Sequence, residues 1–293
     1  MSRYLRIALL WLYVATAVLT AGLLISLRVF GINKFQAAPT DMRKVENGVN
    51  NAFCQSLTLN PSDPFEAYSF DGEPVVDPNK FEKFNTSYSM FLTGDTYEYW
   101  GFYFLKGSKA VVVSSGDADI SVFIIKGNSN LQAWIDSRGK CNGCYLISHP
   151  TSPVFTYTLN VSQSDDYYLL YYSTSRYILP VNSNVYITRT LYDVSSATSN
   201  CSYRPDGKPC SFDMSLKPQM NVVYHNGGNG THDSIDMWTV CKSRVWMYVI
   251  VFALIPALMA SGVTFLLWKY CKDERSQELQ ALVSEDSLPH NKF

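Results

Sequence analysis

Two uncharged apolar stretches bracket this chain and limit what it can fold into. They are Ile7–Leu27 and Val245–Trp268, and neither contains Asp, Glu, Lys, Arg or His. At about 1.5 Å per residue, each is long enough to cross a hydrocarbon core of roughly 30 Å as a helix. The sequence therefore predicts a membrane protein with two transmembrane helices.

The region between the two stretches has features typical of the secretory pathway. Six of the seven cysteines lie there. So do four Asn-x-Ser/Thr sequons, at Asn85, Asn160, Asn200 and Asn229. Disulfide formation and N-glycosylation both take place in the secretory lumen. We expect an extracellular or lumenal middle region, with both termini cytoplasmic, in the plasma membrane or the endomembrane system.

The first apolar stretch allows two interpretations, an uncleaved anchor or a cleaved signal peptide. Its apolar region spans about 21 residues, which exceeds the about 7–15 usual for a signal peptide. No clean Ala-x-Ala cleavage site lies directly before Arg28. We favour the uncleaved anchor, and the cleaved signal peptide stays as the alternative.

The predicted order of segments follows from these boundaries. It is a cytoplasmic tail (residues 1–6), a transmembrane helix (7–27), a stalk (28–53), a disulfide-linked β ectodomain (54–241), a second transmembrane helix (245–268) and a cytoplasmic tail (269–293). We expect Ser195–Gly230, which is rich in Ser, Asn, Pro and Gly, to form long loops with a short strand or two.

The ectodomain is expected to be all-β, an antiparallel sandwich or jelly roll. Short β-branched and aromatic runs recur without helical periodicity between them. The predicted strands are Tyr97–Leu105, Ala110–Ser114, Ile120–Ile125, Val154–Val161, Tyr167–Ser173 and Asn184–Leu191. Turns are predicted at Lys106–Lys109 and Ser115–Asp117, and one short helix near Asn130–Ser137.

The lumenal cysteines suggest a structural framework. They are Cys54, Cys141, Cys144, Cys201, Cys210 and Cys241. Six cysteines allow 15 pairings, so the sequence alone does not fix the connectivity. Proximity favours Cys141–Cys144 and Cys201–Cys210, and Cys54–Cys241 would then join the start of the ectodomain to its end.

The spacing Cys141-Asn-Gly-Cys144 is also that of a C-x-x-C redox motif. Such a motif needs a helix N-terminus to lower the thiolate pKa. Asn-Gly is instead the preferred centre of a hairpin turn, and Tyr145-Leu-Ile resembles an outgoing strand. A structural disulfide across the turn is the favoured interpretation, and a redox or zinc pair is the alternative.

The run Asp165–Tyr172, of sequence DDYYLLYY, has the most unusual local composition. Tyrosine offers a large contact area with a polar tip, so the run suggests an aromatic binding surface. The other interpretation, which we favour, is a sandwich strand with tyrosines on both faces.

No catalytic motif is present, and we expect no catalytic residues, no resident metal and no cofactor. His225, His232 and Asp233 could gather a metal, but they lie in a glycine-rich segment that we expect to be a loop. The formal net charge of −1 does not indicate nucleic acid as a partner. The expected partners are the lipid bilayer and other membrane proteins, and the ligand is unknown.

The second apolar stretch carries small residues four positions apart, at Ala253, Ala257 and Ser261. Small side chains let helices approach closely in lipid, so these residues are candidates for helix packing. Alanine is also common in any membrane helix. Pro256 should kink the helix because it removes one hydrogen bond. Cys271 is a candidate for S-palmitoylation, and a free thiol without a role is the alternative.

The order of features resembles the lumenal region of the Aberrant Pollen Development membrane ubiquitin ligases of plants. The resemblance rests on Trp100–Lys109 (WGFYFLKGSK), Ile120–Ile125 (ISVFII), Trp134 and the pair Tyr167-Tyr168. It implies the two-span topology with an ectodomain between the spans, used for endomembrane sorting or for recruiting partners.

Those ligases carry a RING domain with eight zinc ligands after the second span. Beyond Trp268, this sequence offers only Cys271 and His290, which cannot build a RING. We therefore do not expect ubiquitin ligase activity. The expected function is that of a non-catalytic two-span glycoprotein, an accessory, adaptor or receptor-like subunit acting through protein association. The alternatives are an ectoenzyme with a metal-assisted site at His225, His232 and Asp233, and an auxiliary subunit of a channel or transporter.

Overall fold

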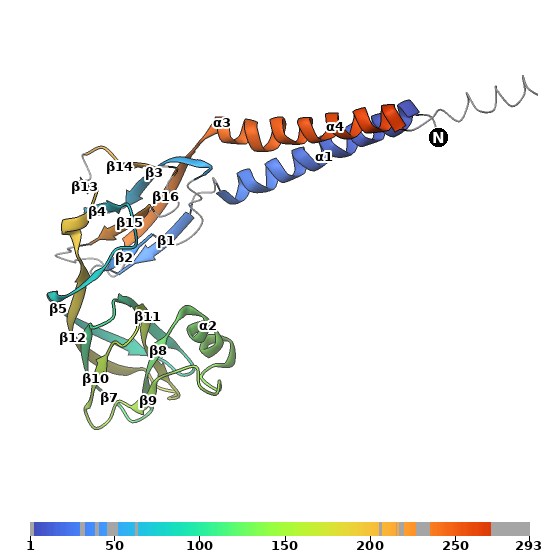
Figure 1. The fold of residues 1–293 in the computed structure, drawn as a ribbon. Coiled ribbons are helices and arrows are strands. Elements are labelled where there is room, and N and C mark those ends of the chain that lie inside the picture. The colour runs from blue at the N-terminus through green and yellow to red at the C-terminus, as the bar shows by residue number, and fades with distance from the viewer. Residues whose placement is uncertain are drawn as a thin grey trace, which may run out of the picture. The chain divides into compact units, whose positions relative to one another are not determined.

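The computed structural model describes residues 3–29, 33–38, 41–45, 52–61, 64–204, 207–214, 216, 220–226 and 235–270 (Figure 1). The chain divides into two compact units. One comprises Met1–Gly31, Gly48–Ser56 and Cys241–Phe293, and we call it the membrane unit. The other comprises Ile32–Asn47 and Leu57–Val240, and we call it the β unit.

The membrane unit contains two apolar spans. The first is α1 (Arg3–Val29). The second consists of α3 (Val245–Tyr248), the π-helical turn η2 (Val249–Leu254) and α4 (Ile255–Tyr270). Both are long and apolar enough to cross a membrane, with mean hydropathies of 2.2 and 2.4. Because α1 already begins at Arg3, most of the segment expected as a cytoplasmic tail is helical.

The second span changes its helical form directly before Pro256. This proline cannot donate a hydrogen bond to the carbonyl group four residues earlier, and its ring crowds that carbonyl. The wider turn η2 (Val249–Leu254) ends two residues before the proline. A π-helical turn is one of the recognised ways in which a helix absorbs such a disturbance.

The β unit contains an antiparallel sandwich. One sheet has the order β10-β7-β12-β5, formed by Phe155–Asn160, Lys109–Gly116, Leu179–Tyr192 and Val76–Leu92. The other has the order β6-β11-β8-β9, formed by Tyr97–Phe104, Asp165–Ser173, Ile120–Lys126 and Ile147–Pro150. Buried side chains from both sheets, such as Val112, Val185, Val122 and Leu169, form one core. Burial of this apolar surface is the main force that holds the sheets together.

The expected strands are present, with ends displaced by a few residues. The short helix is also confirmed, as α2 (Asn128–Ser137). The turn expected at Ser115–Asp117 is misplaced, because β7 continues through Ser115 and Gly116, which pair with Asn182 and Val181 on β12.

The tyrosine-rich strand β11 is a central strand of its sheet, which confirms the interpretation as a sandwich strand. Tyr167 and Tyr171 point into the core and are buried. The hydroxyl group of Tyr171 lies 2.5 Å from the hydroxyl of Ser114 and 2.7 Å from that of Ser183, so its polar tip is satisfied inside the core.

The remaining strands form two further four-stranded sheets. One has the order β1-β16-β3-β14, formed by Asn33–Ala37, Ile235–Ser243, Cys54–Pro61 and Cys210–Asp213. The other has the order β13-β4-β15-β2, formed by Ser199–Tyr203, Phe65–Phe70, Asn221–His225 and Met42–Lys44. A short 3-10 turn, η1, covers Val194–Ser196.

These two sheets include segments for which the sequence suggested little structure. The stalk expected over residues 28–53 supplies β1 and β2, because Ala37 and Met42 are buried apolar residues in short edge strands. The loops expected over Ser195–Gly230 supply β13, β14 and β15. Their strands are four or five residues long, too short for periodicity to stand out against the surrounding Ser, Asn and Gly.

Candidate functional site

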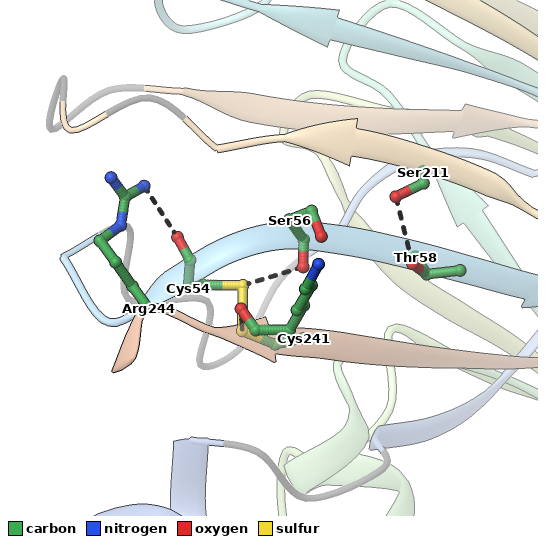
Figure 2. The surroundings of a disulfide bond; sticks show 7 residues. Cys54, Ser56, Thr58, Ser211, Cys241 and Arg244 are labelled. Carbon is green, nitrogen blue, oxygen red and sulfur yellow. Dashed lines mark hydrogen bonds between the residues drawn. A yellow bond between two sulfur atoms is a disulfide. The ribbon is translucent and has the colours of Figure 1, made fainter. Parts of the chain in front are cut away.

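The ends of strands β3 and β16 are joined by a disulfide between Cys54 and Cys241 (Figure 2). The two Cα atoms are 5.7 Å apart, and Cys54 is fully buried. The Sγ atom of Cys54 lies 3.4 Å from the carbonyl oxygen of Ser56. This approach is a contact and not a hydrogen bond, because a disulfide sulfur carries no proton.

The disulfide is tied to the start of the second span by Arg244. Its backbone N–H donates to the carbonyl of Phe53 at 2.8 Å, and its Nη2 donates to the carbonyl of Cys54 at 3.1 Å. The ring of Phe53 packs on Tyr248, with 4.9 Å between the ring centroids. Cys54, Arg244 and the aromatic pair therefore fix where the helix leaves the strand, and aromatic and basic residues are typical of such membrane-interface positions.

The two apolar spans pack against each other within the membrane unit (Figure 1). Ala260 on α4 is buried, with 3% of its surface exposed. One turn further on, Thr264 accepts a hydrogen bond of 3.1 Å from the indole Nε1 of Trp11 on α1. A small residue and an interhelical hydrogen bond are the two contacts expected to hold helices together in lipid.

The three residues expected to pack between helices are placed differently from one another. Ala257 is partly buried, whereas Ala253 and Ser261 are exposed. The fully buried small residue is instead Ala260, which the sequence spacing did not single out. Ala253 and Ser261 therefore remain candidates for contacts with another protein.

The other cysteines form the two short-range bonds that proximity favours. Cys201–Cys210 joins β13 to β14, and Cys141–Cys144 closes a small loop. The expected hairpin at Asn142-Gly143 is not present. The four residues form a bend between α2 and β9, with Gly143 at a φ of 81°. Tyr145 therefore precedes a short edge strand instead of leaving a two-residue turn.

Three predicted glycosylation sites lie on strands of the β unit, and all three side chains are exposed. They are Asn85 on β5, Asn160 on β10 and Asn200 on β13. Asn229 and Cys271, the predicted palmitoylation site, lie outside the described residues, as do His232 and Asp233.

A cluster of charged residues surrounds Arg189 on β12. Only 4% of its side chain is exposed. Its Nε donates to Oε2 of Glu82 at 3.2 Å, and its Nη2 donates to the carbonyl of Asn226 at 3.1 Å and lies 3.0 Å from Nε2 of His225. Glu66 completes what we call the Arg189 cluster, 3.8 Å from Nδ1 of His225.

The electrostatics of this cluster favour a neutral histidine. Burial lowers the pKa of His225, and the positive charge of Arg189 lowers it further. Burial raises the pKa of Glu82, but the hydrogen bond and charge of Arg189 outweigh it, so the net pKa is lowered. The guanidinium already occupies the side of His225 that a metal would approach. In the described part of the chain, no three metal-binding side chains gather.

A buried carboxylate lies at Asp41. Its two oxygens accept hydrogen bonds from the backbone N–H of Ala38 at 3.0 Å and from that of Tyr103 at 3.1 Å. Burial raises the pKa of Asp41 to about 6, against the lowering effect of these hydrogen bonds and of nearby arginines. Arg43, two residues on, forms a bidentate pair with Asp166 at 2.9 and 3.2 Å.

Neither Arg189 nor Asp41 was predicted from the sequence. A signal for Arg189 was available. On β12 the odd-numbered positions face inward, as Val185 and Ile187 show, and Arg189 falls on the same alternation. A charged residue at an inward position must find a partner inside the protein. For Asp41, which lies between two strands, no comparable pattern exists.

The membrane unit and the disulfides together define the setting of the protein. The two apolar helices indicate membrane insertion, and the disulfides indicate that the β unit lies in an oxidising compartment, extracellular or lumenal.

Two family models match long parts of the chain. The model described as E3 ubiquitin-protein ligase APD1-4, N-terminal, matches residues 62–131, and the model described as E3 ubiquitin-protein ligase APD1-4, middle domain, matches residues 156–261. The chain belongs to the APD1-4 family. The two matches run from β4 into α2 and from β10 into α4, so the APD1-4 regions include most of the sandwich and most of the second span.

Comparisons outside the APD1-4 family are weak. None of the curated proteins matches the chain. Among solved structures, the periplasmic g-type lysozyme inhibitor PliG of Aeromonas hydrophila is 13% identical, covers 35% of this chain and 85% of its own, and gives a TM-score of 0.26. The PliG of Salmonella Typhimurium is 19% identical, covers 35% and 90%, and gives 0.23. The VP2 subviral particle of infectious bursal disease virus is 8% identical, covers 74% and 78%, and gives 0.27. Likeness at this level carries no argument.

Proposed function

We propose that this protein is a two-span membrane glycoprotein that acts by binding other membrane proteins and has no catalytic activity of its own. In this proposal the β unit is lumenal or extracellular, both termini are cytoplasmic, and Asn85, Asn160, Asn200 and Asn229 carry glycans. The exposed positions of the first three are compatible with modification.

The observation that carries the proposal is the distribution of small residues on the second span. Ala260 is buried in the membrane unit, whereas its neighbour Ser261 and the more distant Ala253 are exposed. In lipid, exposed small residues allow another helix to approach closely, and a serine hydroxyl can donate a hydrogen bond to it. The partner we propose is therefore a membrane protein that contributes a transmembrane helix.

A metal-assisted catalytic role lacks support. A metal-assisted site at His225 would need to displace Arg189, whose Nη2 lies 3.0 Å from the imidazole Nε2. An auxiliary subunit of a channel or transporter is compatible with the proposal and would be recognised by the identity of the partner.

Topology is tested first. Asn85→Gln, Asn160→Gln, Asn200→Gln and Asn229→Gln variants should each lower the apparent mass by one glycan. Tags at either terminus should be digested by protease added outside sealed microsomes, whereas the β unit should be protected. Protection of either terminal tag would contradict the two-span arrangement.

Association is tested by comparing substitutions on the exposed side of α4. An Ala253→Leu, Ser261→Leu variant should lose a membrane partner that the wild-type protein retains in mild detergent, as measured by native purification and mass spectrometry. Met259→Leu is the control, because Met259 is 66% exposed and the change conserves side-chain volume. Retention of every partner by the double variant would contradict recognition through this helix.

A further inference from the structure

An aromatic pocket lies beside α2, on the face of sheet β6-β11-β8-β9 that points away from the sandwich core. Its volume is about 240 Å³. It is lined by Asp95, Tyr97, Trp134, Ile135, Arg138 and Tyr172. The cavity within the sandwich core is only about 20 Å³ and entirely apolar, which is too small for a ligand.

The strand register builds two walls of this pocket. Tyr97 on β6 and Tyr172 on β11 are paired directly, so their side chains leave the sheet on the same face. Trp134 on α2 meets both rings edge-on, with centroid distances of 5.6 Å to Tyr97 and 5.7 Å to Tyr172. The disulfide Cys141–Cys144 and Phe123 pack behind the indole and hold it in place.

The indole of Trp134 forms the back wall of the pocket. Trp134 is completely buried, and its indole Nε1–H finds no acceptor among the described residues. Gly139 lies against this edge of the ring, because a Cβ at that position would come within 3.3 Å of Nε1. The N–H group is therefore closed off from solvent, and the polar groups that can meet a ligand are those at the rim.

The rim of the pocket carries one acid and one base. The Oδ1 atom of Asp95 accepts a hydrogen bond of 2.9 Å from the hydroxyl of Tyr172. The guanidinium of Arg138 lines the same pocket, close enough for its positive charge to act on Tyr172. The charges of Asp95 and Arg138 cancel, so the pocket does not favour a ligand with net charge. The pocket offers hydrogen-bond donors and acceptors together. This suits a hydroxyl group, because a hydroxyl both donates and accepts hydrogen bonds.

A flat aromatic surface continues outward from the pocket. The rings of Tyr97 and Tyr99 lie 6.4 Å apart and are inclined by only 21°. Both are open to solvent, with 37% and 43% of their surfaces exposed. An apolar ring face of this kind can cover the C–H face of a saturated ring, while hydroxyl groups at the edge of that ring reach polar partners.

We propose that this pocket binds a neutral saccharide. One sugar ring would occupy the pocket against Tyr97 and Tyr172, with the buried indole of Trp134 supporting both rings from behind. Its hydroxyl groups would donate to Asp95 and accept from Arg138. A second sugar unit would then lie over Tyr99. The site is separate from the helix surface through which we propose protein association.

Saturation-transfer NMR on the full-length protein in lipid nanodiscs tests this proposal. The probes are glucose, galactose, mannose and N-acetylglucosamine, with their disaccharides. At least one should receive magnetisation from the wild-type protein. Asp95→Asn and Tyr97→Ala should each weaken its binding by about tenfold or more, since a hydrogen bond to a charged group or a stacked ring is lost. Asparagine tolerates the left-handed φ of 59° at position 95, so this variant should fold.

Tyr186→Ala is the matched control, because Tyr186 is also an exposed strand tyrosine, 48% exposed, and does not line the pocket. It should bind the sugar as the wild type does. The proposal is overturned if no probe receives magnetisation, or if Asp95→Asn and Tyr97→Ala bind like Tyr186→Ala. It is also overturned if a zwitterion such as phenylalanine binds the pocket and no saccharide does.

Discussion

Arg189 on β12 and Glu82 on β5 are direct partners in an antiparallel strand pair, and the guanidinium Nε of the first donates to Oε2 of the second at 3.2 Å. The two side chains differ in burial: 4% of the arginine side chain is exposed, whereas 40% of the glutamate side chain is exposed. The same guanidinium reaches His225 and the carbonyl of Asn226 on the neighbouring segment. The pair therefore connects the sandwich to strand β15 through a charge that has little access to water.

Removing the glutamate should be costly, because it leaves a buried guanidinium without a countercharge. We expect Glu82→Gln to lower the free energy of unfolding by about 2–3 kcal/mol, below the range for fully buried pairs because Glu82 is partly exposed. Thermal or denaturant unfolding of the purified protein measures this change. Glu66→Gln is the control, because Glu66 is 51% exposed and its carboxylate lies 3.8 Å from the imidazole of His225 and accepts a hydrogen bond of 2.6 Å from the hydroxyl of Tyr68, instead of pairing with Arg189. An equal effect of the two substitutions would show that the pairing with Arg189 adds nothing.

The sequence was sufficient for those parts of the fold whose residues repeat a pattern. The apolar runs Ile7–Leu27 and Val245–Trp268 are long and uninterrupted, and the β-branched strands such as Ile120–Ile125 carry a strong local signal. These elements appear as expected. β1 and β2 could not be found in this way, because short edge strands are defined by their pairing partners, which lie far away in the sequence.

For the candidate sites too, features with a local sequence pattern could be predicted, and features that depend on tertiary packing could not. The run Asp165–Tyr172 was recognisable by composition, and its alternation places Tyr167 and Tyr171 inside and Tyr172 outside. The pocket beside Tyr172 was not recognisable, because it depends on how α2 carries Trp134 over the sheet. The buried small residue of the second span was also not recognisable. Spacing identifies a set of small residues but not the one that faces α1.

The ionisation of Asp41 should give stability an unusual dependence on pH. The pKa of Asp41 in the folded protein is about 6, above its ordinary value of 3.8. A raised acid pKa means that the folded state binds the proton more tightly than the unfolded state. The cost of burying the charge is therefore fully present above pH 6 and is relieved as the pH falls through 6 towards 4.

The measurement compares the wild-type protein with Asp41→Asn, which cannot titrate at this position. Between pH 7.5 and pH 5, the wild type should gain about 1 kcal/mol of unfolding free energy relative to the variant. His225 titrates in both proteins, so its opposite contribution cancels in the difference. Asp117→Asn, in an exposed turn, is the control and should show no such change. A difference between wild type and Asp41→Asn that stays constant with pH would contradict the raised pKa.

Ala260 and Ser261 are adjacent in sequence but differ in burial. Substitutions at the two positions therefore distinguish the contact between α1 and α4 from a contact with a partner helix. Ala260→Leu should force α1 and α4 apart, because the larger side chain does not fit where only 3% of the alanine is exposed. Ser261→Leu should leave the helix pair intact. Crosslinking of a Trp11→Cys, Thr264→Cys pair with a short bis-maleimide measures the contact, since the long indole of Trp11 bridges these positions in the wild type and a direct disulfide would need a closer approach of the two backbones. Equal crosslinking in the Ala260→Leu and Ser261→Leu backgrounds would contradict this arrangement of the helices.

The disulfide Cys54–Cys241 should contribute more to stability than either of the other two bonds. Its cysteines are 187 positions apart in the sequence, whereas those of Cys141–Cys144 are 3 apart. Closing so long a loop restricts the unfolded chain, which is worth up to ~4–5 kcal/mol in the chain-entropy model and often less in practice. A Cys54→Ser, Cys241→Ser variant should therefore unfold at a markedly lower temperature and be retained in the endoplasmic reticulum. A Cys141→Ser, Cys144→Ser variant should show a smaller loss, because its loop is short. Peptide mapping without reduction checks the connectivity directly, and a peptide that joins Cys54 to any cysteine other than Cys241 would refute the pairing on which this prediction depends.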